Sequence, residues 1–341
     1  MKWISVLKDR LYRYSFYCFA NSLEVCQYMK GNIHNKNLLK ICYAVLSPYF
    51  LLKWGIREIT DYTIGQLNIS TEKEYEYKDQ LSVVAIVKNE GLYIREWIEF
   101  HKIVGVTKFY IYDNESNDQL EKILASYIKS GEVVYEYFPG KSKQLDAYNN
   151  AVKKYKNNTK YMAFIDLDEY LMPSHYGEKL PEVIDSILSI NKHAAGVGVT
   201  WRIFGSSGHI NKPKGMVIEN YMKRSVDYCW QNFHIKTVCD PRKIDRVVSP
   251  HFVKYKSGYW CINEFGRRLR AWFPLGQCFD KIKINHYFCK SREEALLKWN
   301  RGLADRNTKY DWKKFEDYDL NDIQDDSMVP YIKILKQKLE R

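Results

Sequence analysis

The sequence predicts an α/β protein built on a mixed, mainly parallel sheet. Short β-branched runs alternate with amphipathic helical patterns between residues 81 and 165. Polar residues follow the ends of those runs, which is where ligands bind in open parallel sheets. The length of 341 residues, with 45% hydrophobic and 28% charged side chains, suffices for a packed core and excludes a wholly disordered chain.

Each predicted strand is a short apolar run that ends at a polar turn. The first run is LSVVAIV, and the fourth, YMAFI, continues directly into DLDEYL. Between the strands, apolar side chains recur at helical spacing, and Gly131 and the pair Pro139-Gly140 break the pattern. The predicted strands are 81–87, 108–112, 132–138 and 161–165, with another opening the segment 196–208, and the predicted helices are 94–104, 120–128 and 145–155.

The net charge of +12 is concentrated in two parts of the chain. Residues 201–300 carry 19 basic and eight acidic side chains, and residues 1–70 carry nine and four. Residues 71–200 have a net charge of −4. The excess is therefore local, and it suggests one surface that faces phosphate and a second that faces an anionic membrane.

The main domain is expected at 79–305, between a basic helical extension at 1–78 and a helical tail at 306–341. The most apolar stretch, 38–52, is shorter than the roughly 20 residues that a spanning helix needs. The extension is predicted to form amphipathic helices that either pack on the domain or make peripheral contact with a membrane. Eight cysteines without a C-x2-C pair favour a reducing compartment, so we expect a cytoplasmic protein, at the inner face of the membrane if the extension binds lipid.

A pair of carboxylates follows the fourth predicted strand. Asp166 and Asp168 flank Leu167, so both can present oxygens to one hard cation at a strand end. A cation held there would bridge a diphosphate and neutralise the charge on a departing phosphate. The alternative is an Asp-rich turn without a ligand. A cation site for Mg²⁺ or Mn²⁺ is the preferred interpretation.

Polar residues also follow the first two predicted strands. Lys88, Asn89 and Glu90 come after the first, and Asp113 and Asn114 come after the second. Such side chains can hydrogen bond to a base and a ribose, although helix capping explains them equally well when each group is taken alone. Their position at successive ends of one sheet, together with the Asp166 pair, favours a ligand site.

Two later segments add candidate residues. The sequence GVGVTWRIFGSSG predicts a strand followed by a Gly/Ser loop, where small residues permit close backbone approach to a ligand. Trp201 could stack on a sugar and Arg202 could pair with a phosphate, whereas a tight turn with a buried Trp explains the segment as well. His286 precedes a capping-box pattern at Ser291 and Glu294, and it is a plausible third metal ligand.

The collinear order of these motifs resembles glycosyltransferase family 92 and its bacterial relatives. The segments that carry the resemblance are KNEGLYIREWIEFHKIVGVTKFYIYDNESND, QLDAYNNAV, FIDLDEYLMP, WRIFGSSGH and INHYFCKSREE. Together they cover roughly residues 81–304. The resemblance implies a GT-A fold, a Rossmann-like nucleotide-sugar-binding sandwich, and inverting transfer, commonly of galactose from UDP-galactose with Mn²⁺.

Carried over to this chain, the resemblance implies a metal on Asp166, Asp168 and His286. It implies a nucleotide-sugar donor, and as acceptor a glycan or lipid-linked glycan in cell-surface polysaccharide or lipopolysaccharide synthesis. The residues predicted to bind the donor, from the resemblance and from their own chemistry together, are Lys88, Asn89, Glu90, Asp113, Asn114, Gln144, Trp201, Arg202, Gly205, Ser206, Ser207 and Gly208.

Inversion requires a carboxylate that deprotonates the attacking hydroxyl. In GT-A enzymes this base follows the glycine loop and precedes the C-terminal histidine. Glu219 is the first candidate because it follows the loop closely, and Glu264 is the second, with a surface carboxylate as the alternative for each.

Two other functions compete with this interpretation. A strand followed by D-x-D also describes haloacid-dehalogenase-type phosphatases, although Tyr170 stands where that family has Thr or Val and three strands precede the motif. The charge of +12 invites a nucleic-acid-binding protein, but no helix-turn-helix, zinc-finger spacing or RNP-like motif supports one, so no nucleic-acid partner is expected.

Overall fold

The computed structural model describes residues 76–270, 276–300 and 312–340, together with scattered residues between 45 and 63. The predicted N-terminal extension therefore lies almost entirely outside the described residues. Within the described part, no helix is both long enough and apolar enough to cross a membrane. The five cysteines described there, at 229, 239, 261, 278 and 289, are free thiols.

The core of the molecule is a mixed sheet in the order β12-β11-β6-β8-β4-β1-β2-β3, with β13 joined to β6 and β5 joined to β13. β1, β2, β3 and β4 are parallel, whereas β8 runs antiparallel to both β4 and β6. The strands of the sheet are β1 (Asp79–Val87), β2 (Lys108–Asp113), β3 (Val133–Tyr137), β4 (Thr159–Phe164), β5 (Glu169–Pro173), β6 (Ala194–Ile203), β8 (Ile235–Cys239), β11 (Trp260–Ile262), β12 (Arg268–Leu269) and β13 (Ile282–His286).

Two small strand pairs flank this sheet. β9 (Ile244–Ser249) pairs with β10 (Phe252–Tyr255), and β7 (Lys223–Arg224) pairs with β14 (Ile323–Gln324). The helices are α4 (Gly91–Ile103), α5 (Leu120–Ile123), α6 (Ala125–Lys129), α7 (Gln144–Tyr155), α8 (Leu180–Leu188), α9 (Val217–Asn220), α10 (Arg292–Asn300), α11 (Trp312–Tyr318) and α12 (Val329–Leu339), with short 3-10 turns at Trp230–Asn232 and Pro241–Lys243.

The predicted α/β class and mixed sheet are confirmed, and the predicted strands agree with the observed ones to within two residues at each end. One prediction was wrong in detail. The helix expected over 120–128 is broken at Leu124 into α5 and α6. β5, which directly follows the Asp166–Asp168 turn, was not predicted. It is stabilised by pairing with β13, more than 100 residues later in the chain, and such a distant partner leaves no local sequence pattern.

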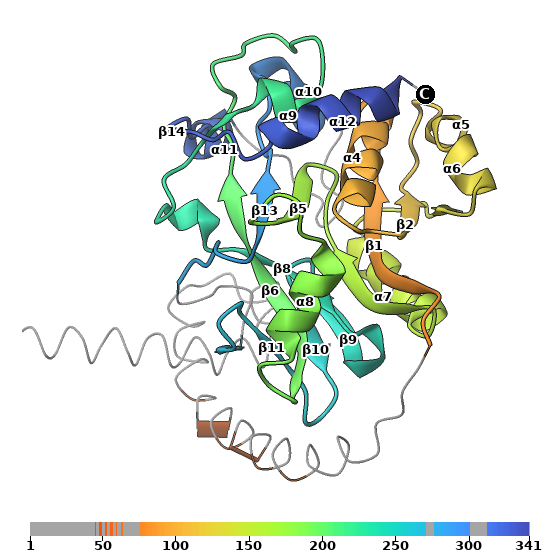
Figure 1. Cartoon of the computed structure of the whole chain (residues 1–341), viewed down its shortest axis with the longest axis vertical. Helices are drawn as coiled ribbons and strands as arrows, with labels where there is room; N and C mark the ends of the chain where they lie inside the picture. Colours follow the sequence, from red (N-terminus) through yellow and green to blue (C-terminus); the bar gives the residue numbers. More distant parts are fainter. Residues whose placement is uncertain are drawn as a thin grey trace, which may run out of the picture.

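The sheet buries apolar side chains on both faces. One core lies under α4 and α8 and includes Trp97, Phe100 and Ile184, while a second lies under α7 and includes Tyr148 and Phe164. Figure 1 shows α9, α10 and α12 gathered at one end of the molecule, with β9, β10 and β11 at the other. The polar ends of the central strands are thereby enclosed by C-terminal elements.

The described part of the tail packs on this domain. β14 pairs with β7, and α12 lies against α4, where Tyr331 contacts Phe100 with ring centroids 5.3 Å apart. Asp319 and Asn321 accept hydrogen bonds from the backbone of the Gly/Ser loop at 2.6 and 2.7 Å. Residues 312–340 are thus part of the same packed body.

Candidate active site

Asp166 lies in the turn between β4 and β5, where three side chains bind its carboxylate. Gln144 donates from Nε2 to Oδ1 at 2.9 Å, and Tyr148 donates to the same oxygen at 3.3 Å, both from α7. Lys236 of β8 donates to Oδ2 at 2.8 Å. The structure therefore brings the predicted residues Asp166 and Gln144 together and adds a lysine that the sequence had not indicated.

Lys236 is completely buried, and its ammonium balances two carboxylates. Its Nζ lies 2.8 Å from Asp166 and 3.6 Å from Glu169, which is also fully buried. Burial alone would lower the pKa of Lys236, but the two carboxylates raise it above its ordinary value. Burial raises the pKa of Glu169, and Lys236 opposes that shift. Lys236 therefore stays protonated at neutral pH and anchors the turn.

Asp168 is the second carboxylate of the turn, and it faces two cationic or basic groups. Lys298 of α10 binds its Oδ2, and His286 Nε2 at the end of β13 lies 3.5 Å from the same oxygen. Burial would raise the pKa of Asp168, but Lys298 and His286 hold it well below its ordinary value. The predicted pair Asp168 and His286 is thus brought together at the carboxyl end of the sheet.

Lys290 adds a further buried cation to this corner. Its backbone is left-handed at φ 52°, a conformation that non-glycine residues rarely adopt and that clusters at functional sites. Its Nζ lies 3.4 Å from the centroid of the Tyr93 ring. Burial lowers the pKa of Lys290, while Glu90 and Asp168 oppose that change. The predicted residue Glu90 therefore belongs to the same electrostatic environment as Asp168.

Trp201 lines the site without presenting a free ring face. The centroid of its ring lies 4.3 Å from that of His286. It stacks on His234 with the centroids 4.9 Å apart, and His251 lies edge-on to it with the centroids 5.1 Å apart. The side chain is only 7% exposed. Neighbouring imidazoles cover the indole, which agrees with the alternative of a buried Trp, and sugar stacking by Trp201 stays a prediction.

The polar residues after β1 and β2 hydrogen bond mainly to each other's loops. Asn89 donates from its backbone to Ser116 at 2.9 Å and accepts from the Asn117 backbone at 2.8 Å. Asp113 accepts from Tyr135 at 2.6 Å, and Asn114 donates to the carbonyl oxygens of residues 138 and 140. Lys88 pairs with Glu115 at 3.6 Å. These contacts stabilise the loops, and none of them joins the loops to Asp166 or Asp168.

The Gly/Ser loop of residues 205–208 is held by the C-terminal segment. A Cβ on Gly205 would lie 2.5 Å from the Asn321 side chain and from the Leu320 carbonyl. Ser207 accepts from the Lys223 backbone at 3.0 Å, and Ser206 accepts from Gly208 at 3.1 Å. The close backbone approach at Gly205 is therefore made to the protein's own tail, and a ligand contact of the loop stays a prediction.

Glu264 has a structural environment. It is 2% exposed and accepts backbone hydrogen bonds from Asp280, Lys281 and Ile282 at 2.8–3.2 Å. These hydrogen bonds give Glu264 a structural role, and its role as the second candidate base stays a prediction. Glu219 lies on α9 and pairs with Lys336 of α12 at 3.2 Å.

Asp166, Asp168 and His286 do not surround one point. Among the residues that the structure describes, no group of three or more His, Cys, Asp or Glu side chains is placed to hold a metal ion. Asp166 is turned toward Lys236, whereas Asp168 and His286 approach each other. The residues that the sequence had not indicated are Lys236, Lys290 and Lys298. Lys236 stands inside an apolar run, HIKTVC, and this was the one sequence feature that could have indicated a buried lysine.

Comparison with known proteins identifies the family. The profile of glycosyltransferase family 92 matches residues 83–327. A family 92 protein of Oryza sativa subsp. japonica is 28% identical over 147 residues, covering 42% of this chain and 24% of that protein. The β-1,4-galactosyltransferase galt-1 of Caenorhabditis elegans is 29% identical over 138 residues, covering 37% and 32%. The chain spans about a quarter to a third of the length of these relatives.

One similar solved structure is S. aureus TarS 1-349 in complex with UDP, which is 15% identical, with a TM-score of 0.33 and coverage of 48% of this chain and 47% of that one. The profile match covers most of the chain, from β1 to beyond β14. It agrees with the family resemblance and not with the phosphatase alternative. The described strands and helices form an α/β fold, and the chain belongs to glycosyltransferase family 92.

Proposed function

We propose that this glycosyltransferase moves a hexose, with inversion, from a nucleotide-sugar to a hydroxyl of a glycan or lipid-linked glycan in cell-surface polysaccharide or lipopolysaccharide synthesis. UDP-galactose is the proposed donor, and the support is the galactosyltransferase name of the 29% identical relative. The observation that carries the proposal is the Asp168 carboxylate, held between Lys298 and His286 with Lys290 close by. A buried and a half-buried lysine beside a carboxylate suit a diphosphate and its counter-cation.

Asp168 and His286 fit a divalent cation better than Asp166 does. Asp168 Oδ2 and His286 Nε2 are 3.5 Å apart, and burial lowers the pKa of His286, which leaves the imidazole neutral as a metal ligand must be. A carboxylate and an imidazole are ligands that Mn²⁺ accepts, and Mg²⁺ would use the carboxylate. When bound, the metal would act as a Lewis acid toward the leaving diphosphate.

The chain's own residues have separate proposed tasks around this centre. Lys298 and Lys290 would bind donor phosphate oxygens, and Gln144 would orient Asp166 through its hydrogen bond at 2.9 Å. Glu219 is the proposed base that takes the proton of the acceptor hydroxyl. Because general base catalysis contributes about 10²–10⁴-fold, Glu219→Gln is expected to lower kcat by that factor and to leave donor binding intact. An unchanged kcat would remove Glu219 from this role.

Donor binding tests the proposal directly. A thermal-shift panel of UDP-, GDP- and CMP-sugars, each with and without Mn²⁺, is expected to raise Tm for UDP-galactose in the presence of metal, because a ligand of the native state stabilises it. Asp168→Ala is expected to abolish that shift. The matched control is Asp146→Ala, which removes an exposed carboxylate paired with Lys143 on α7. Failure of every nucleotide-sugar to raise Tm would overturn the proposal.

Peripheral membrane contact through residues 1–78 remains part of the proposal, with the protein at the cytoplasmic face. The nine basic and four acidic side chains of residues 1–70 support it. Co-sedimentation of the full chain with anionic but not neutral vesicles is the expected result. Equal recovery with both vesicle types would contradict it.

A further inference from the structure

The paired strands β6 and β13 carry polar side chains on the face opposite to His286. Their parallel register joins Trp201 to Ile284 and Arg202 to Asn285. Side chains alternate along a strand, so Arg202 and Lys283 project to one face, while Trp201 and His286 project to the other. The sheet therefore separates Arg202 and Lys283 from the candidate active site.

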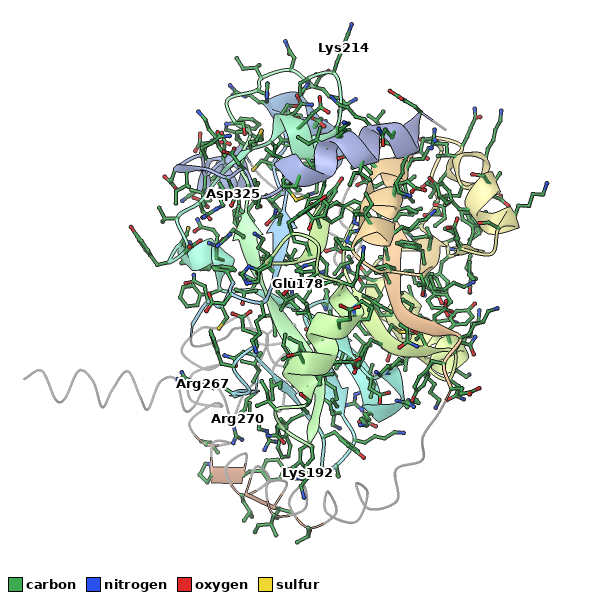
Figure 2. All side chains as sticks on the ribbon, viewed as in Figure 1. Glu178, Lys192, Lys214, Arg267, Arg270 and Asp325 are labelled. Atoms are coloured by element: carbon green, nitrogen blue, oxygen red, sulfur yellow. The ribbon has the colours of Figure 1, made fainter. Side chains whose placement is uncertain are left out.

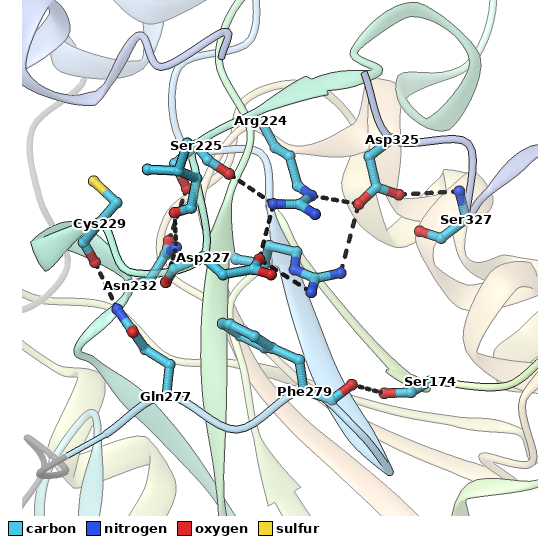
Figure 3. A network of polar contacts seen from close by, with 12 residues as sticks. Ser174, Arg224, Ser225, Asp227, Cys229, Asn232, Gln277, Phe279, Asp325 and Ser327 are labelled. Atoms are coloured by element: carbon cyan, nitrogen blue, oxygen red, sulfur yellow. Dashed lines mark hydrogen bonds and ion pairs between the residues drawn. The ribbon is translucent and has the colours of Figure 1, made fainter. Parts of the chain in front are cut away.

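Positive charge exceeds negative charge on this second face. Arg202 contacts Asp227 at 3.1 Å and Asp325 at 3.5 Å. Arg224 contacts the same two carboxylates at 2.9 and 2.5 Å, and Figure 3 shows it between them. Lys283 interacts electrostatically with all four groups. Three cations thus share two carboxylates.

Two side-chain donors of this cluster have no partner among the described residues. Lys283 Nζ forms no hydrogen bond or ion pair there and reaches the surface, although the residue as a whole is only 4% exposed. The Nε atom of Arg202 is buried and likewise lacks a hydrogen-bond acceptor among the described residues. Buried charged donors are costly to leave unpaired, so this geometry requires an explanation.

We propose that this face is a binding site for a phosphate-class oxyanion, which accepts hydrogen bonds from Lys283 Nζ and Arg202 Nε and displaces the Asp227 carboxylate. Asp227 is the replaceable partner because its side chain is 51% exposed, whereas that of Asp325 is 6% exposed. Asp325 is also bound by the Ser327 backbone at 3.0 Å, as Figure 3 shows. With Asp227 displaced, three cations face one carboxylate, and the excess of two charges matches a dianion.

The environment of Lys283 supports this assignment. Burial and the neighbouring Arg202 lower its pKa to about 8. The charged groups that face it are Arg202 on β6, Arg224 on β7, Asp227 after β7 and Asp325 after β14. A bound dianion would favour the protonated lysine, and solvent reaches the cluster where Asp227 is exposed. Neither the donor nor a metal is involved, so this inference goes beyond the proposed function.

Calorimetric titration of the full chain with inorganic sulfate at pH 7 tests the proposal. Sulfate is a suitable probe because its charge stays constant between pH 6 and 9. Lys283→Met is expected to weaken sulfate binding at least about tenfold, because a charge-assisted hydrogen bond is lost. Lys254→Met removes one charge from an exposed pair with Asp245 and serves as the matched control, with affinity unchanged. Equal affinity in wild type and Lys283→Met would overturn the proposal.

A second variant, a pH series and two further anions show whether sulfate binds at the proposed site. If sulfate instead bound beside Asp168, Lys298→Met would lose binding while Lys283→Met retained it, which also refutes the proposal. In the wild-type protein, sulfate affinity is expected to fall as the pH rises through 8, because Lys283 then loses its proton. This pH series still tests the proposal if Lys283→Met folds poorly. Titration with inorganic phosphate and with glycerol phosphate then distinguishes a free oxyanion from a phosphate monoester.

Discussion

The two faces of the β6–β13 pair differ in how their buried charges are balanced. On the His286 face, Asp166 contacts Lys236 and Asp168 contacts Lys298, so each carboxylate has a cation. On the opposite face, Lys283 has no direct partner and two carboxylates serve three cations. Because burying an unpaired charge is costly, the carboxylates of the first face are balanced within the protein, whereas the cations of the second face are not.

The basic block of residues 201–300 divides in the same way. Figure 2 places Lys214 at one end of the molecule, whereas Arg267 and Arg270 lie toward the other end. The basic side chains of residues 201–300, which add up to +11, are therefore spread over the fold. A phosphate-facing role for part of this block stays a prediction.

The largest expected effect concerns the His286 face. Asp168→Asn should lower sugar transfer by about 10²–10³-fold, because it removes the negative charge that faces Lys298 and His286 in a water-poor site. Release of UDP in the presence of acceptor measures this. Asp146→Asn is the control and should keep the wild-type rate. Comparable loss in both variants would show that Asp168 has no special role.

The next effect compares the two buried lysines. Lys236→Met should destabilise the protein by about 3–5 kcal/mol, because Asp166 and Glu169 lose their common cation. Lys283→Met should be neutral or stabilising, because it removes a buried cation without a partner. Urea unfolding measures both. Equal destabilisation by the two substitutions would abolish the distinction between the faces.

A smaller effect is the pH dependence that Lys283 imposes on stability. Its pKa is about 8 when folded and 10.5 when unfolded, so between those values the unfolded chain binds more protons. The free energy of unfolding contributed by this group therefore rises with pH in that window, by about 1.4 kcal/mol per pH unit at most. The difference between wild type and Lys283→Met, measured from pH 8 to 10, should show that rise. A flat difference would contradict it.

The smallest expected effect concerns the ion pair between Lys336 and the proposed base Glu219. Lys336→Gln breaks the contact with Glu219, where the lysine is 52% exposed, and should cost less than about 1 kcal/mol. The kcat of this variant should stay at the wild-type value if Glu219 alone is the base. A large loss of stability in urea unfolding would mean that α9 and α12 depend on this pair.

The strand-end residues show how far sequence reasoning reached. Asp166 and Asp168 were predicted because a buried strand followed by acidic residues has a local pattern, and His286 because it precedes a capping box and could complete a metal site. The structure places Asp168 beside His286 and Gln144 beside Asp166. What covers Trp201 and Gly205 could not be predicted, because only the packed structure shows it.

The sequence by itself determined the α/β class, the positions of the first four strands and the family to which the chain belongs. Periodicity and motif order are local properties, so they can be read along the chain. Only the tertiary structure decided which charges meet. Lys236 reaches Asp166 across 70 residues, and Arg224 reaches Asp325 across 101. Such pairings depend on strand register and on the direction in which each side chain projects, and neither is encoded in a local pattern.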